Sequence, residues 1–263
     1  MRELLTRMHT WMTRYMKSFY SDDEEVQRGI LIKETHTGYV TANCVDLAKF
    51  LKLSTHDTEL AEIIGLFHDA GRFRQYSIYK TFNDADSEDH ADLALKVIDE
   101  LDFFKELTAS DYDLVKFAIQ NHNKKTIAPT DDERKLLFAK LIRDADKLDI
   151  YRVLEPFLAQ ENVDKMPQFI KSRGNLVAEI SPDFVENFVT GEQADYTKIR
   201  TNGDRKIVRL MWIYDVNFSW TMKKIVERGY IEKIVSNLPP DERVAEGVRR
   251  LRLHVEEKLS EVM

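Results

Sequence analysis

Apolar side chains recur at spacings of three and four residues along most of the chain, and this period restricts the fold more than any other feature. The stripe from Leu4 to Phe19 sets the pattern at once, with polar residues between its apolar positions. Only nine glycines and six prolines occur in 263 residues, which is too few for the frequent turns of a many-stranded β fold. We therefore predict an all-α protein.

Local signals mark the ends of several expected helices. These helices cover residues 3–20, 24–52, 56–70, 88–104, 109–122, 132–160, 204–228 and 241–260. Ser54 and Asp57 fit a capping box at the start of the third helix, and Gly71 is expected to stop that helix. Residues 72–86 predict a loop that carries aromatic and acidic side chains.

The sequence contains no internal repeat, low-complexity tract or evident linker. We expect a single all-α domain over residues 1–263, with its core at 24–160, an N-terminal helix at 3–20 and a C-terminal helical extension at 161–263. The N-terminal helix has basic residues on its polar face, so binding to a membrane surface is conceivable. Packing of its apolar stripe on the protein's own core is the commoner arrangement, and we predict it here.

Composition and charge argue against several classes of protein. The chain is 43% hydrophobic and 32% charged, which is typical of a soluble globular protein. Its net charge of −7 disfavours a nucleic-acid polymer or an anionic membrane as partner, although a local basic pocket is compatible with it. Cys44 is the single cysteine, which excludes an internal disulfide and a cysteine-based zinc site. No apolar run approaches the roughly 18 residues of a membrane span, and the N-terminus lacks a signal-peptide core, so we expect a cytoplasmic protein.

Four of the seven histidines lie on apolar faces of the expected helices. They are His36, His68, His90 and His122. A polar ring on such a face points inward, where it needs a hydrogen-bond partner or a ligand. A single histidine of this kind is usually a core residue bonded to the backbone. Four of them, together with Asp69 and the later Asp144 and Asp146, favour convergence on one or two metal ions.

The types and positions of these residues suit a metal site. Neutral imidazole and carboxylate are ligands that Mn, Fe and Zn accept. His90 lies in the first turn of its expected helix, where the positive end of the helix dipole disfavours imidazolium and leaves a nitrogen available. A carboxylate such as Asp69 can bridge two ions about 3.5–4 Å apart, which a single imidazole nitrogen cannot do.

A histidine, a His-Asp dyad and a distal aspartate follow one another on successive expected helices. These residues are His36, His68, Asp69 and Asp146. Their order resembles the HD superfamily of metal-dependent phosphohydrolases. Residues 63–72, IIGLFHDAGR, are similar to the superfamily's signature around its dyad, and residues 145–148, ADKL, are similar to its distal signature. The resemblance covers about residues 30–155 and implies an HD-domain helical bundle.

This resemblance implies a primary metal site made of His36, His68, Asp69 and Asp146. His90 and His122 resemble the extra ligands of a subgroup with two-metal centres, so we expect one or two divalent ions of Mn, Fe, Co, Ni, Zn or Mg. That subgroup includes cyclic-dinucleotide phosphodiesterases, which have a His-His pair and a Gly-Tyr-Pro segment. The present chain has Asn121-His122-Asn123 and no such segment, so hydrolysis of cyclic-di-GMP is not expected.

Asp144 competes with Asp146 for the distal ligand position. Two residues apart on a helix, they point in nearly opposite directions, so at most one should reach a single metal ion. Both have apolar neighbours, and only the superfamily's Ala-Asp-basic pattern favours Asp146. Asp149 is predicted to be a surface or helix-pairing acid. The acids that precede His90 are expected only to cap its helix: Asp84, Asp86 and Asp89.

Two basic residues near the dyad are candidates for binding a substrate phosphate. The resemblance assigns this role to Arg72, which completes the predicted catalytic set with His68 and Asp69. Lys147 is a second and weaker candidate. Arg72 could equally be a solvated cation that complements the end of a helix, and both interpretations stay open.

The reaction implied by the resemblance is hydrolysis of a phosphoester in a nucleotide, phosphomonoester or phosphodiester by a metal-bound hydroxide. A di-iron oxygenase is an alternative, because such enzymes use the same helical scaffold and a similar ligand set. A non-catalytic, metal-bound regulatory module is a third possibility. The expected partner is a small phosphorylated substrate or nucleotide, and neither a nucleic-acid polymer nor a membrane is expected. The oligomeric state is left open.

Overall fold

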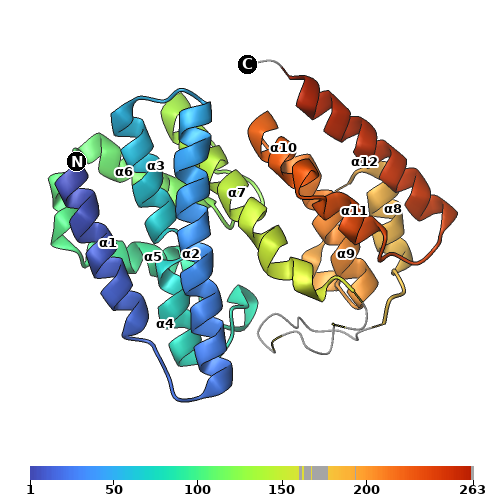
Figure 1. The fold of residues 1–263 in the computed structure, drawn as a ribbon, viewed down its shortest axis with the longest axis horizontal. Helices are drawn as coiled ribbons and strands as arrows, with labels where there is room; N and C mark the ends of the chain where they lie inside the picture. The colour runs from blue at the N-terminus through green and yellow to red at the C-terminus, as the bar shows by residue number, and fades with distance from the viewer. Residues whose placement is uncertain (160–161, 163–166, 168–176, 193, 262–263) are drawn as a thin grey trace. The chain divides into compact units, whose positions relative to one another are not determined.

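The computed structural model shows a helical protein with two compact units. It describes residues 1–159, 162, 167, 177–192 and 194–261. One unit covers Met1–Ile150 and the other Tyr151–Met263. Helices form both units (Figure 1), and no strand occurs among the described residues, so the predicted all-α class is confirmed. None of the described helices is long and apolar enough to span a lipid bilayer.

The first unit is formed by helices that pack against one another. They are α1 (Arg2–Lys17), α2 (Glu24–Phe50), α3 (Thr55–Phe67), α4 (Ala70–Tyr79), α5 (His90–Asp99), α6 (Ala109–Asn121) and α7 (Glu133–Leu154) as far as Ile150, with short 3₁₀ helices at Asp84–Asp86 and Asp102–Glu106. The long α2 packs along α3 and contacts α4, while α5 contacts α4 and α6. These contacts bring the α3–α4 junction close to α2 and to the start of α5.

Helix α1 packs on the core of its unit through the apolar stripe seen in the sequence. Its buried residues are Leu4, Leu5, Met8, Met12 and Met16. On the same helix, the Trp11 ring stacks on Phe67 at the end of α3, with the ring centres 5.9 Å apart. The structure therefore confirms that the stripe packs on the protein's own core.

The junction between α3 and α4 differs from the sequence prediction. Helix α3 begins as expected, since the Ser54 hydroxyl accepts a hydrogen bond of 3.0 Å from the Asp57 N–H. It ends at Phe67, however, and Gly71 lies inside α4 instead of stopping α3. A Cβ atom on Gly71 would lie 2.2 Å from the carbonyl oxygen of His90, so glycine is needed for the close approach of α4 to α5.

The prediction of a loop over residues 72–86 was wrong for its first half. Helix α4 continues to Tyr79, and its residues Phe73, Gln75 and Tyr76 are buried. The helix contacts α2 and α5, so burial of this face stabilises a helix that the local sequence does not mark. The rest of the segment is irregular apart from one short 3₁₀ helix.

The second unit consists of shorter helices followed by the long α12. They are α8 (Pro182–Thr190), α9 (Asn202–Met211), α10 (Ser219–Glu227), α11 (Tyr230–Val235) and α12 (Glu242–Ser260), with 3₁₀ helices at Glu155–Phe157, Tyr196–Lys198 and Trp212–Asp215. The 3₁₀ helix at Trp212–Asp215 interrupts the helix expected over 204–228. Helix α9 begins with a capping box formed by Thr201 and Asp204. The extension was expected to begin at 161, and part of it lies outside the described residues. The second compact unit begins at Tyr151, and the assignment of the whole chain to one domain stays a prediction.

Candidate metal centre

Helix α2 supplies His36 from a buried position in its middle. His36 Nδ1 lies 2.6 Å from Asp149 Oδ2, and His36 Nε2 lies 3.0 Å from Asp146 Oδ1. Both aspartates belong to α7, so this one ring connects two helices that are far apart in the sequence. When Nδ1 carries the hydrogen and donates it to Asp149, the lone pair of the neutral ring lies on Nε2. The same hydrogen bond orients the ring so that Nε2 faces the other acidic groups.

The His-Asp dyad lies where α3 ends and α4 begins. His68 directly follows α3, and its Nδ1 lies 2.8 Å from the carbonyl oxygen of Gly65, to which it donates a hydrogen bond. The free lone pair on His68 Nε2 lies 3.6 Å from Asp69 Oδ2 and 3.8 Å from Asp146 Oδ1. Adjacent side chains diverge on a continuous helix. The break between α3 and α4 lets His68 and Asp69 face one centre.

His90 and His122 approach from α5 and from the end of α6. His90 Nδ1 lies 2.6 Å from Asp84 Oδ2, and His122 Nδ1 lies 2.6 Å from the carbonyl oxygen of Ile119. Both Nδ1 atoms therefore act as donors, which leaves a lone pair on each Nε2. The two Nε2 atoms face each other at 3.0 Å. Lone pairs at this distance repel unless a proton or a metal ion interacts with them.

Asp69 connects the two pairs of histidines through its two oxygen atoms. Its Oδ2 lies 3.5 Å from His36 Nε2 and 3.6 Å from His68 Nε2. Its Oδ1 lies 3.5 Å from His90 Nε2 and 3.7 Å from His122 Nε2. A carboxylate with one oxygen facing each pair is suited to bridge two ions.

The donor set fits divalent transition metals. The Nε2 atoms of His36 and His68 are buried, and neither has a hydrogen-bond partner among the residues that the structure describes. Burial of such nitrogens is costly unless a ligand satisfies them. The ligand atoms of His36, His68 and Asp146 lie within 4.8 Å of one another, as do those of His68, Asp69 and His122. Imidazole and carboxylate ligands suit ions such as Mn, Fe and Zn. These clusters could therefore hold divalent ions.

Asp146 is the acid on α7 whose carboxylate lies beside the Nε2 atoms of two candidate ligand histidines. Its Oδ1 reaches both His36 and His68, as described above. Asp144 is also buried, but two residues away on a helix its side chain takes a different direction. The geometry therefore favours Asp146, whose role as a ligand stays a prediction. Lys147 is partly buried beside it, and its predicted contact with phosphate is likewise still to be tested.

Burial and charge act in opposite directions on the histidines. Burial lowers the pKa of His68 to about 4 and that of His90 to about 3, so both rings are neutral near pH 7. Burial also acts to lower the pKa of His36, but contacts with the carboxylates of Asp146 and Asp149 raise it overall. The centre therefore presents neutral imidazole nitrogens from at least two of its rings, as metal binding requires.

We expect the metal-free protein to lose stability as the pH falls from about 7 to 5. The folded-state pKa values of His68 and His90 lie below the ordinary value of 6.5, so the unfolded chain takes up protons first. The raised pKa of His36 opposes this effect for one ring only. The free energy of unfolding should therefore fall by about 2 kcal/mol. Urea unfolding in the presence of a chelator measures it, and a free energy that stayed level or rose would contradict the prediction.

Two aspartates contact the Nδ1 atoms of two candidate ligand histidines, His36 and His90. Of the two roles expected for Asp149, the surface position was wrong and the helix-pairing role fits, because this residue of α7 is buried beside His36 Nδ1 of α2. Asp84, expected only to cap a helix, contacts His90 Nδ1 instead. Asp89 does cap α5, since it accepts hydrogen bonds from backbone N–H groups in the first turn. Carboxylates placed in this way orient an imidazole ring and raise the basicity of its other nitrogen.

Replacing Asp149 by asparagine should weaken metal binding about 10- to 100-fold, because His36 loses the charge that orients its ring. Helical content should stay near that of the wild type, since asparagine has nearly the same shape. Calorimetric titration with Mn²⁺ measures the affinity. Asp46→Asn, at a 62% exposed side chain on α2, is the matched control. Equal Mn²⁺ affinities for the two variants would show that Asp149 does not position His36.

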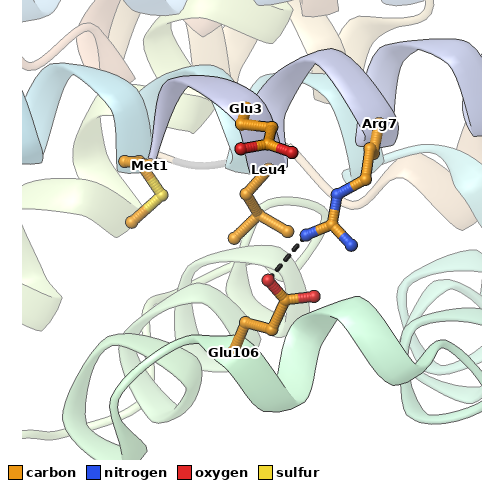
Figure 2. Close-up of a pocket in the computed structure, with 5 residues that line it drawn as sticks. All are labelled: Met1, Glu3, Leu4, Arg7 and Glu106. Carbon is orange, nitrogen blue, oxygen red and sulfur yellow. Dashed lines mark hydrogen bonds and ion pairs between the residues drawn. The ribbon is translucent and has the colours of Figure 1, made fainter.

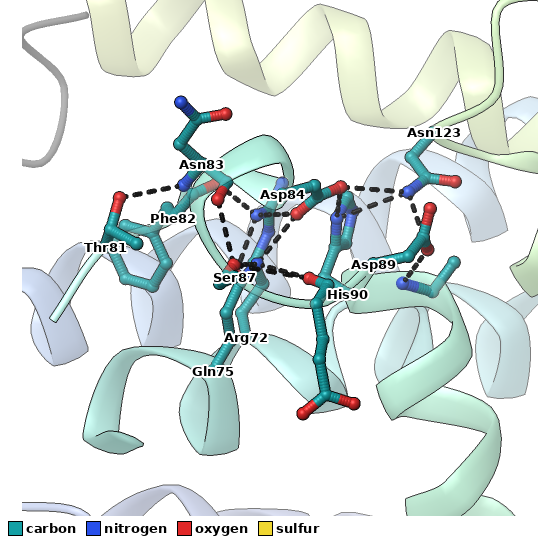
Figure 3. Close-up of polar contacts among 12 residues, drawn as sticks. Arg72, Gln75, Thr81, Phe82, Asn83, Asp84, Ser87, Asp89, His90 and Asn123 are labelled. Atoms are coloured by element: carbon teal, nitrogen blue, oxygen red, sulfur yellow. Dashed lines mark hydrogen bonds and ion pairs between the residues drawn. The ribbon is translucent and has the colours of Figure 1, made fainter. Parts of the chain in front are cut away.

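Arg72 belongs to a polar network beside His90 (Figure 3). Its Nη1 donates to Gln75 Oε1 at 2.8 Å, to the Phe82 carbonyl oxygen at 2.5 Å and to Asp84 Oδ1 at 2.9 Å. Asn123 Nδ2 joins the network by donating to Asp84 Oδ2 at 3.2 Å. The guanidinium thus connects α4 to the segment before α5, and the interpretation of Arg72 as a solvated cation was wrong. Its role in binding phosphate stays a prediction.

Sequence reasoning missed Lys33, whose ammonium contacts the central carboxylate. Lys33 Nζ lies 2.6 Å from Asp69 Oδ2. Burial acts to raise the pKa of Asp69, but neighbouring cations, Lys33 first among them, hold it well below its usual range. The spacing of Lys33 and His36 could have revealed this residue. Side chains three apart on a helix share a face.

A surface hollow at the start of α1 contains none of the candidate ligands (Figure 2). It has a volume of about 390 Å³ and is lined by Met1, Glu3, Leu4, Arg7 and Glu106. An ion pair of 2.6 Å joins Arg7 Nη2 to Glu106 Oε2, and both side chains are about half exposed. Such an exposed pair contributes little to stability. We assign no function to this hollow.

Comparison with known proteins identifies the family of the first unit. Residues 34–151 match the family model described as the HD domain. This span contains all six residues of the candidate metal centre. No curated protein and no solved structure gave a significant match. HD domains are typically metal-dependent phosphohydrolases. Residues 34–151 of this chain are therefore an HD domain.

Proposed function

We propose that this protein is a metal-dependent phosphohydrolase that cleaves a phosphoester in a nucleotide, phosphomonoester or phosphodiester. One observation carries the proposal. Four histidines direct Nδ1 to a protein acceptor, and each has its Nε2 within 3.7 Å of an Asp69 oxygen. This arrangement supports two divalent ions on either side of one carboxylate. The HD domain supports the reaction class.

The six candidate ligands would divide into two sets that share one residue. The first set is His36, His68, Asp69 and Asp146, and the second is Asp69, His90 and His122. When bound, divalent ions supply a water of lowered pKa and neutralise negative charge on the phosphoryl group. Asp149 and Asp84 orient the imidazole rings, and the hydrogen bonds of Arg72 hold the segment before α5 in place.

A small phosphorylated molecule or nucleotide is the substrate class that we propose. The net charge of −7 disfavours a nucleic-acid polymer, whereas a single phosphoryl group needs only local positive charge. The ligand side chains are largely buried, which also favours a reacting group at the end of a small molecule. The proposed location is the cytoplasm.

Metal analysis of protein purified without added metal is the first test of this proposal. After loading with Mn²⁺ we expect about two ions per chain. Nucleotides, phosphomonoesters and phosphodiesters are then assayed with Mn, Fe, Mg, Co and Ni. Metal binding without hydrolysis of any phosphoester would contradict the proposal. Bound iron together with oxygen uptake on a small polyol or phosphonate would indicate the di-iron oxygenase instead.

A further inference from the structure

Lys33 contacts a carboxylate oxygen that the metal site also needs. It lies one helical turn before His36 on α2, and its Nζ is 2.6 Å from Asp69 Oδ2. The same oxygen lies 3.5 Å from His36 Nε2 and 3.6 Å from His68 Nε2. An ammonium group and a divalent ion held by these nitrogens repel each other strongly at such short range. Occupation of the metal site would therefore displace Lys33 from Asp69.

The side chain of Lys33 is able to change partner. It is 17% exposed, whereas the Asp69 side chain is 3% exposed, so the ammonium has a route toward solvent that the carboxylate lacks. Lysine carries its charge on a flexible four-carbon stem, which allows the charge to move while the backbone stays in place. The ammonium also lies 5.5 Å from the centre of the Phe82 ring. Lys33 thus lies at the edge of the centre.

Arg72, the other cation beside Asp69, is less free to move. Its Nη1 makes three hydrogen bonds, to Gln75, Phe82 and Asp84. Its Nε is buried at 3.5 Å from Asp69 Oδ1. Moving this guanidinium would break the network that holds the segment before α5. Of the two cations at Asp69, Lys33 is the one that a metal ion would release.

We propose that Lys33 exchanges Asp69 for a phosphoryl oxygen of the substrate when the metal ions bind. In the metal-free protein the ammonium neutralises Asp69. In the metal-loaded protein it offers a charge-assisted hydrogen bond to an anion at the same centre. This inference rests on the proposed phosphohydrolase function and adds a substrate-binding residue outside the six candidate ligands. The ligand class is a phosphoryl group, and inorganic phosphate is its simplest member.

Two calorimetric titrations of the full chain test the exchange: Mn²⁺ into metal-free protein, and inorganic phosphate into Mn²⁺-saturated protein. Lys33→Met should bind Mn²⁺ about tenfold more tightly, because no ammonium has to leave Asp69. It should bind phosphate about tenfold more weakly, because the cation that receives the anion is gone. Lys33→Arg should keep the phosphate affinity within about threefold of the wild type. Lys49→Met, on the same helix at a 66% exposed side chain, should change neither affinity.

Other results would overturn the exchange. If Lys33→Met protein binds Mn²⁺ and has wild-type affinity for phosphate, Lys33 does not bind the substrate, and the phosphohydrolase proposal still stands. If the variant binds Mn²⁺ more weakly than the wild type, Lys33 only supports the fold of the site. Failure of the proposed function itself gives a different result, since the wild-type chain would then bind no Mn²⁺ or hydrolyse no phosphoester.

Discussion

We expect the Asp146→Ala variant to lose its tightly bound metal and its hydrolytic activity while its helical content stays near that of the wild type. The carboxylate contacts the Nε2 atoms of both His36 and His68, at 3.0 and 3.8 Å. Removing it deprives the first ion of an anionic ligand and leaves the two imidazoles without the charge that faces them. The side chain is 15% exposed, so its truncation leaves only a small cavity in the helix packing.

The expected loss of activity is more than about a hundredfold, because losing even an outer partner of a metal ligand costs about 10- to 100-fold. Three measurements on the same sample test this. Metal content is determined after gel filtration in metal-free buffer, helical content by circular dichroism, and turnover on whichever phosphoester the wild type hydrolyses. A variant that keeps both its metal and its activity would exclude Asp146 as a ligand.

Asp144 offers the matched comparison, because it lies on the same helix and its position in the sequence made it the competing candidate. Asp144→Asn preserves the shape of a fully buried side chain, which Asp144→Ala does not. We expect Asp144→Asn to keep its bound metal, whatever it does to the free energy of unfolding. Loss of metal from Asp144→Asn, with metal retained by Asp146→Ala, would show that Asp144 is the distal ligand.

Long helices of the first unit could be predicted because their signals are local. The helices expected over 24–52 and 109–122 are present as α2 and α6. Each begins after a side chain that accepts a hydrogen bond from the first turn, Asp23 for α2 and Thr108 for α6. Capping residues and an apolar period of 3.6 do not depend on the rest of the fold, which explains this success.

Helix α4 could not be predicted in this way, because its position depends on a neighbouring helix. A glycine after a helical pattern is typical of a helix end, and Gly71 was interpreted as one. Its actual role is to allow the backbone of His90 to come close, and no local signal distinguishes the two roles. The aromatic and polar residues after Gly71 were assigned to a loop for the same reason.

The candidate ligand histidines were visible in the sequence, whereas their partners were not. A histidine on an apolar helical face stands out because the other residues of that face are hydrophobic. Asp149 and Lys33 do not stand out, because charged residues on helices usually face solvent. Asp149 contacts His36, and Lys33 contacts Asp69. In each pair the two residues lie far apart in the sequence. Such pairings arise only when the helices pack.

We further expect the double variant His90→Ala, His122→Ala to retain about one metal ion per chain and to lose most of its activity. In the structure both rings direct Nδ1 to a protein acceptor, and their Nε2 atoms face each other at 3.0 Å. Burial lowers the pKa of His90 to about 3, so near pH 7 this ring carries no second proton on Nε2. These two nitrogens and Asp69 Oδ1 would hold a metal ion, which would relieve the repulsion of the lone pairs.

The first ion should survive this change because its ligands come from other elements. His36 and His68 belong to α2 and to the α3–α4 junction, and Asp69 Oδ2 faces them rather than the altered pair. Metal content measured by mass spectrometry and turnover of a phosphoester together report the outcome. A double variant at two histidines outside the cluster, His9→Ala with His56→Ala, controls for the loss of two imidazoles. It should keep the metal content of the wild type.

Two other outcomes assign different roles to His90 and His122. If they bind a substrate phosphate directly beside a single ion, the double variant keeps its full metal content and chiefly raises KM. If they are only core residues, it again keeps its metal, and the free energy of unfolding falls by about 2–5 kcal/mol for each large-to-small change. The two-metal assignment also predicts the metal content of the wild-type protein. A stoichiometry near one ion per chain in metal-saturated wild-type protein would exclude this assignment. In that case Asp69 would not be a bridge, and its Oδ1 would be available to orient the two rings instead.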